Sequence, residues 1–200
     1  MPKSRVEAFS DGVFAVAITL LVLDLHPPST HGSLLAALAD GWPEFAAFAL
    51  SFAVIGIIWV NHHAVFHRIA RVDRTLLFLN LGLLLSVVLI PFVTALFALY
   101  IAHTGDQADL AGALYNADFL LVAIFFTAIN VRVDTEARLR REHVPPTSPA
   151  QRLRFAAGTF VYAACIPLSY VNPVLALILD AAVAVFYIGD QLGSRTAADD

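Results

Sequence analysis

Near its start the chain reads Arg5-Val-Glu-Ala-Phe-Ser-Asp-Gly12 and continues directly into Val13-Phe-Ala-Val-Ala-Ile-Thr-Leu-Leu-Val-Leu23. A charged and polar cluster is thus joined to an apolar helix without a linker. Because a carboxylate beside hydrocarbon is costly, Asp11 needs a partner and a purpose. The apolar part carries one hydroxyl, Thr19, near its middle. We expect a helix that packs against protein at one end and faces water along one stripe.

The composition is typical of an integral membrane protein. Of the 200 residues, 59% are hydrophobic and 14% are charged, whereas a soluble domain is about 45–50% apolar and about 25% charged. A transmembrane helix needs about 20 residues, so this length accommodates several spans and no separate soluble domain. The single cysteine, Cys165, cannot form an intrachain disulfide, and the redox compartment therefore cannot be inferred.

Apolar segments separated by polar or proline-containing breaks predict six transmembrane helices. Their approximate bounds are 8–25, 43–66, 75–101, 112–132, 153–170 and 173–192. The first segment also has some features of a signal peptide, but Glu7 and Asp11 interrupt its approach and no small-residue cleavage site follows it. We predict an all-α integral membrane protein in which residues 1–200 form one six-helix domain.

The basic residues indicate the orientation. All 12 Lys and Arg residues lie at the two termini and in the second and fourth connections between the segments. Cytoplasmic loops carry the excess of Lys and Arg, and an even number of spans brings both termini to one side. We predict a multi-pass protein of the cell membrane with cytoplasmic N- and C-termini. The arginine-rich connection 132–154 is interpreted as a determinant of topology that can contact anionic lipid, and no nucleic-acid partner is expected.

One face of the first helix has a spacing that suits two different roles. The stripe contains Gly12, Val16, Thr19 and Leu23. In a monomer it would pack against a neighbouring helix, which is the simpler interpretation of the spacing alone. In a symmetric oligomer it would line a central path, with Val16 and Leu23 as apolar constrictions and Thr19 as a ring of oxygens for transient contact with K⁺. The secondary candidates for the lining are Gly12, Leu20 and Asp24.

The polar residues that flank this helix are expected to form structural contacts. Arg5 and Asp11 are six residues apart, so each should bond to another helix rather than to the other. The second segment ends in Trp59-Val-Asn-His-His-Ala-Val-Phe-His67. Within it, Asn61 or His62 is a reasonable partner for Ser10 or Asp11.

The histidines of the second segment are not expected to bind a metal. His62 and His63 are adjacent and diverge by about 100° on a helix, so they cannot chelate one ion together. His63 and His67 stand four residues apart and could do so, but no zinc-hydrolase signature accompanies them. We expect interhelical hydrogen bonds here, no bound metal and no cofactor.

Two stretches of the sequence carry a family resemblance. The first contains Arg5, Phe9, Ser10 and Asp11 followed by the apolar run to Leu23, and the second contains Trp59, His62, His63 and Phe66. Together with six spans and cytoplasmic termini, this pattern resembles the endolysosomal potassium channel family in its prokaryotic branch.

The resemblance implies a homotetramer that conducts monovalent cations across the bilayer through a pore on the fourfold axis. The first helix would line this pore, without a re-entrant filter loop, and selectivity for K⁺ over Na⁺ would be weak to moderate. The constriction then falls on Val16, the threonine on Thr19 and the next pore-facing position on Leu23. Val16 is smaller than the isoleucine or leucine expected there, which would widen that ring.

The same resemblance assigns a structural role to the motif. Arg5, Phe9, Ser10 and Asp11 would tie the first helix to the helices behind it, with His62 and His63 as partners.

Other functions were weighed against a channel. A proton-coupled secondary transporter would use Asp11, Asp180 and the histidines, but the chain shows no internal repeat. A membrane assembly protein without transport activity is the other alternative. No P-loop, nucleophile elbow or zinc-hydrolase motif is present, so an enzyme is not expected.

Overall fold

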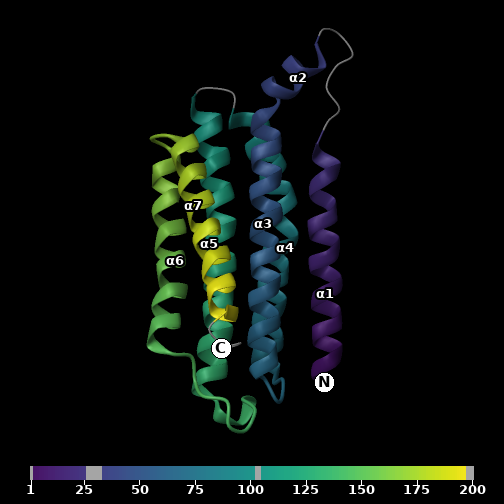
Figure 1. Cartoon of the computed structure of the whole chain (residues 1–200), viewed down its shortest axis with the longest axis vertical. Helices are drawn as coiled ribbons and strands as arrows, with labels where there is room; N and C mark the ends of the chain where they lie inside the picture. Colours follow the sequence, from purple (N-terminus) through teal and green to yellow (C-terminus); the bar gives the residue numbers. More distant parts are fainter. Residues whose placement is uncertain (1, 26–32, 102–104, 197–200) are drawn as a thin grey trace.

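The computed structural model describes residues 2–25, 33–101 and 105–196, with side chains as far as Tyr187. These residues form a bundle of long helices that run side by side (Figure 1). The helices are α1 (Lys3–Leu20, extended by a 3-10 turn over Leu21–Asp24), α2 (Leu34–Asp40), α3 (Trp42–Arg68), α4 (Arg74–Ile101), α5 (Asp106–Thr135), α6 (Pro149–Ser169) and α7 (Pro173–Thr196).

Each predicted segment is helical in the structure, although several bounds differ. The first helix begins at Lys3 rather than at residue 8, so that the charged motif itself is helical. The short helix α2 was not predicted. Within the described part of the chain, four helices are long and apolar enough to cross a membrane: α1 with its 3-10 turn, α3, α4 and α5. In α7, the apolar helix with described side chains spans Pro173–Tyr187 and is shorter.

Side-chain caps set where several of these helices begin. Asp73 precedes α4 and accepts a 2.8 Å hydrogen bond from the backbone N–H of Leu76. Ser148 precedes α6 and forms a capping box with Gln151. Such caps satisfy backbone N–H groups that have no partner within the helix. Asp73 and Ser148 thus end the two connections that hold most of the arginines.

The helices form two groups that meet at α4 and α5. α1 contacts α3 and α4 and stands at the edge of the bundle, whereas α6 and α7 pack on the far side of α5 (Figure 1). The centre is aromatic, because the Tyr115 ring lies 5.1 Å from that of Phe97 and 4.4 Å from that of Phe119. Because α1 stands at the edge of the bundle, one broad face of α1 has no helix of this subunit against it.

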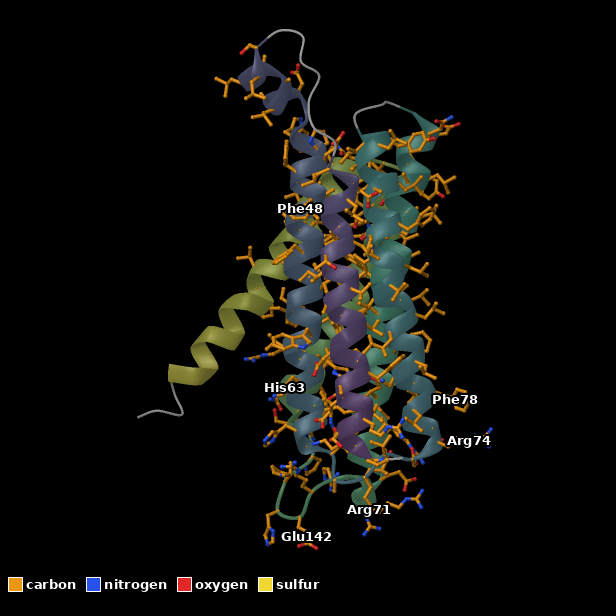
Figure 2. The ribbon with its side chains drawn as sticks, turned by 90° about the vertical axis from the view of Figure 1, so that its right-hand side faces the viewer. Phe48, His63, Arg71, Arg74, Phe78 and Glu142 are labelled. Carbon is orange, nitrogen blue, oxygen red and sulfur yellow. The ribbon has the colours of Figure 1, made fainter. Side chains whose placement is uncertain are left out.

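Ion pairs join the two connections that carry residues 68–74 and 132–154, at what we call the arginine-rich end. Arg68 donates to Asp134 at 2.7 Å and Arg132 donates to Asp73 at 2.7 Å. The hydrogen bond from Arg132 holds the pKa of the Asp73 carboxyl below its ordinary value. α1 begins at this same end (Figure 1), as the distribution of basic residues predicted. Figure 2 shows Arg71, Arg74 and Glu142 projecting from it.

Candidate functional site: one free face of helix α1

Helix α1 has one buried and one exposed face, and both are largely apolar. The buried face contains Val6, Ser10, Phe14, Ala17 and, in the following turn, Leu21. Their three- and four-residue spacing follows the helical repeat, so they form one stripe against α3 and α4. The exposed face is the opposite stripe, which is the one predicted to line a pore.

The predicted pore residues lie on this free face. Val16 is 56% exposed and Leu23 is 72% exposed in the subunit. Leu20 is 38% exposed, and a Cβ atom placed on Gly12 would meet no atom within 4 Å. These exposures show that the stripe is not used for packing within the subunit. A row of exposed large apolar side chains marks a surface that another molecule or the membrane covers.

Thr19 is the hydroxyl on the same exposed face. Its Oγ1 lies 3.0 Å from the carbonyl oxygen of Ala15 and 2.9 Å from that of Val16, to which it donates. The hydroxyl hydrogen is thus directed at the helix backbone, and the lone pairs of the oxygen face outward. An outward-facing hydroxyl oxygen between two apolar positions can replace part of the hydration shell of a passing cation.

Asp24 ends the 3-10 turn that follows α1 and is half-buried. Together with Glu44 and Phe48 it lines a cavity of about 290 Å³ between α1, α3 and α4. Asp24, a secondary candidate for the pore lining, thus lies toward α3 and α4 in the subunit and not on the exposed stripe with Val16 and Leu23.

The other face of α1 is held by a buried hydrogen-bond chain across three helices. The amide nitrogen of Asn80 on α4 donates to Ser10 Oγ at 3.0 Å, and its Oδ1 lies 2.8 Å from Nε2 of His62 on α3. Ser10 in turn donates to the backbone oxygen of Val6 at 2.9 Å. Each of these three side chains is nearly or fully buried. The chain fixes the rotation of α1 and therefore decides which of its faces stays free.

Asp11 is held separately, at the rim of this contact. The indole nitrogen of Trp59 on α3 donates to its Oδ1 at 2.9 Å. Asp11 therefore bonds to another helix, α3, as expected. The sequence suggested Asn61 or His62 as the partner of Ser10 or Asp11. Of these, His62 is linked to Ser10, but through Asn80 rather than directly.

Four of the residues expected to hold α1 against the other helices make no such contact within one subunit. Among the residues that the structure describes, none forms an ion pair with Arg5, and Phe9 is 56% exposed. Asn61 donates to Ile57 of its own helix, so it does not reach α1. His63 is exposed beside Trp59 and points outward from α3 (Figure 2). The expectation that Arg5 bonds to another helix is not met here.

Asn80 is the member of this contact that sequence reasoning failed to place. The sequence feature that could have identified Asn80 is its position. It is an amide in the first part of α4, the most apolar helix, whose mean hydropathy reaches 2.6. A buried amide in such a helix must pair with polar groups on its neighbours.

Replacement of Asn80 by leucine should destabilise the protein by about 2 kcal/mol, because Ser10 and His62 lose a buried partner. For a chain of this size we expect the melting temperature in detergent to fall by about 4–8 °C. Asn61→Leu is the matched control, because it removes a bond within a single helix. If the Asn80 variant melts at the same temperature as the parent protein, the hydrogen bonds of Asn80 to Ser10 and His62 do not contribute to stability.

Comparisons with known proteins agree with this architecture. The sequence profile of a family described as "Endosomal/lysosomal potassium channel TMEM175" matches residues 5–91, which include α1, α3 and much of α4. A potassium channel of Streptomyces collinus is 43% identical over 95% of this chain and 93% of its own length.

A solved structure supports the same relationship. The crystal structure of a lysosomal potassium-selective channel TMEM175 homolog from Chamaesiphon minutus superposes with a TM-score of 0.82. It is 35% identical and covers 93% of this chain and 96% of that one. A Bos taurus relative, described as an endosomal/lysosomal proton channel, is 41% identical over 40% of this chain and 19% of its own length.

The family profile, the 43% identity over 95% of the chain and the superposition with a solved homolog all indicate one family. The chain belongs to the TMEM175 potassium channel family, whose members are ion channels of membranes and not enzymes.

Proposed function

We propose that this chain forms a homotetrameric, potassium-permeable cation channel whose pore is lined by α1 of each subunit. The whole chain would act as one unit, with α6 and α7 as the fifth and sixth spans. The arginine-rich end would face the cytoplasm of a cell membrane, because basic loops are retained on that side. Weak to moderate preference for K⁺ over Na⁺ is expected.

The free face of α1 is the single observation that carries this proposal. It presents Val16 and Leu23 outward with the Thr19 hydroxyl between them, while the opposite face is fixed by the Ser10–Asn80–His62 chain. Around a fourfold axis these positions become stacked rings. Apolar rings gate by excluding water, and a hydroxyl ring gives a dehydrating ion oxygens to contact.

Flux into liposomes tests the proposal. Purified protein is reconstituted in vesicles with a K⁺ gradient, and native mass spectrometry of the same sample gives its subunit number. We expect tetramers that pass K⁺ faster than Na⁺. Intact tetramers with no flux above empty vesicles would contradict the proposal.

A second arm distinguishes the permeant ion. Because the Bos taurus relative is described as a proton channel, the vesicles also carry a pH-sensitive dye under a proton gradient. Cation flux that persists without a pH gradient supports K⁺ conduction. Proton flux without K⁺ flux would reject it, and uptake that requires a pH gradient and saturates would indicate a coupled transporter instead.

A further inference from the structure

We propose a binding site for one anionic glycerophospholipid, with a headgroup rich in hydroxyls, in a crevice between α3, α5 and α6. This site lies apart from the free face of α1 and does not depend on the proposed ion pathway. Three neighbouring cavities form the crevice, and all three are lined by Phe155.

The three cavities follow one another from the arginine-rich end toward the apolar middle of the bundle, and neighbouring cavities share lining residues. The outer two cavities have volumes of about 320 and 170 Å³ and share Asn130 and Thr147. The inner cavity, of about 80 Å³, shares Asn61 with the first and Thr127 with the second. Along α5 the three cavities together extend from Asn130 to Phe119, a length of about 16 Å at 1.5 Å per residue.

The polarity of the lining changes along this length. The outer part presents Arg68, Thr147, Gln151 and Arg152, whereas the inner part is lined mainly by apolar and aromatic side chains such as Ile57, Phe119 and Val122. A polar mouth above a narrow apolar channel suits an amphiphile whose headgroup stays at the surface while one acyl chain enters.

Asn130 supplies an independent observation in favour of a polar ligand at this site. It is 4% exposed on α5, and its Nδ2 donates to the backbone oxygen of Phe126 at 3.0 Å. Its Oδ1 is buried without a hydrogen-bond partner, although the residue lines both outer cavities. A buried acceptor of this kind costs free energy unless a donor reaches it. The hydroxyls of a glycerol headgroup are such donors.

The charge at the mouth favours an anionic headgroup. Asp134 pairs with Arg68 at 2.7 Å and with Arg152 at 3.3 Å, which leaves this cluster with one positive charge in excess. The Arg152 side chain is 59% exposed, so it can contact a phosphate while it remains near Asp134. A zwitterionic headgroup would gain less from this excess charge.

The position of the crevice makes it accessible from the bilayer. None of the described residues that line its three cavities belongs to α1 or α4, so it faces away from the proposed pore. Ala184 and Tyr187 of α7 complete the lining of the inner cavity, and Figure 2 shows α7 leaning away from α3 toward its C-terminal end.

Photolabelling tests the proposal on the whole protein. The channel is reconstituted in phosphatidylcholine vesicles containing a little phosphatidylglycerol that carries a diazirine on one acyl chain. After irradiation, mass spectrometry locates the adducts. We expect them on α5 near Phe119 to Phe126 and on α6 near Phe155, with displacement by unlabelled phosphatidylglycerol and none by phosphatidylcholine.

Variants separate the headgroup contacts from the acyl-chain channel. Arg152→Gln and Asn130→Leu should each lower the labelling about fivefold, since each removes an interaction of about 1 kcal/mol. Ala123→Phe fills the inner cavity and should abolish the labelling there. Ala157→Phe on α6 is exposed, lies outside the lining and should label as the parent does. Size-exclusion profiles show which variants are folded.

Three outcomes would overturn the proposal. The first is labelling spread evenly over lipid-facing residues such as Leu153 and Phe160, which are 72% and 74% exposed. The second is equal labelling by a phosphatidylcholine probe or better displacement by a free fatty acid. The third is unchanged labelling in folded Arg152→Gln and Ala123→Phe proteins.

Discussion

Thr19→Val should lower K⁺ flux through the reconstituted channel about tenfold, which corresponds to about 1.4 kcal/mol in the barrier. The hydroxyl of Thr19 is the oxygen on the free face between Val16 and Leu23. Its removal would make the lining apolar over seven residues, or about 10 Å along the axis. Such a stretch excludes water, and a passing ion loses the oxygens that compensate for its hydration shell. Flux per tetramer in vesicles measures the effect.

Thr135→Val is the matched control for this change. Thr135 is also exposed and donates in the same way to two carbonyls of its own helix, at 2.9 and 3.3 Å. It ends α5, away from α1. The control should conduct as the parent does, and Thr19→Ser, which keeps the hydroxyl, should restore most of the flux. Equal flux in the two valine variants would remove Thr19 from the pathway.

Asp134→Ala should lower the melting temperature by about 6–12 °C. Asp134 is 6% exposed and accepts hydrogen bonds from Arg68 and from the backbone N–H of Thr147. Removal of this carboxylate costs about 3 kcal/mol because Arg68, whose side chain is only 21% exposed, and the backbone N–H of Thr147 both lose their partner. In a chain of this size each kcal/mol shifts the melting temperature by about 2–4 °C. Thermal unfolding in detergent measures the shift.

Glu136→Ala provides the comparison at the same end of the bundle. Glu136 pairs with Arg132 at 3.1 Å and with Arg138 at 3.2 Å, but 35% of its side chain is exposed. Ion pairs this close to solvent contribute about 1 kcal/mol or less. A smaller shift for Glu136→Ala is therefore expected. If the two variants melt alike, burial of the Arg68–Asp134 pair does not stabilise the connections.

The architecture was predictable because hydrophobic length and charge distribution report directly on a membrane. Six segments were placed from apolar runs, and each is helical in the structure. The free stripe at Val16, Thr19 and Leu23 followed from helical spacing together with the resemblance. Spacing alone did not decide between packing and a pore lining, because both roles place small and apolar residues on one face.

The contacts between helices were much less predictable. The sequence places Ser10, Asp11, Trp59 and His62 on two helices but does not show the rotation of one helix against another. The structure joins Asp11 to Trp59 and links Ser10 to His62 through Asn80, while Arg5 stays unpaired among the described residues. Such pairings depend on three-dimensional packing, which single-sequence patterns do not report.

Asp180 illustrates the same limit. The sequence named this carboxyl only as a group that a proton-coupled transporter would use, and in the structure it is fully buried on α7. Asn116 on α5 and Cys165 on α6 lie nearby, but neither of the Asp180 oxygens meets hydrogen-bond geometry with a described residue.

Modification of a Leu23→Cys channel by a permanently charged thiol reagent tests the central claim, that α1 lines the pore. The native Cys165 is fully buried and does not compete for the reagent. Leu153→Cys on α6 is the control, since Leu153 and Leu23 are both 72% exposed in the subunit. If α1 lines the pore, the reagent stops K⁺ flux through Leu23→Cys and leaves Leu153→Cys conducting. Unchanged flux after complete modification of Leu23→Cys would contradict it.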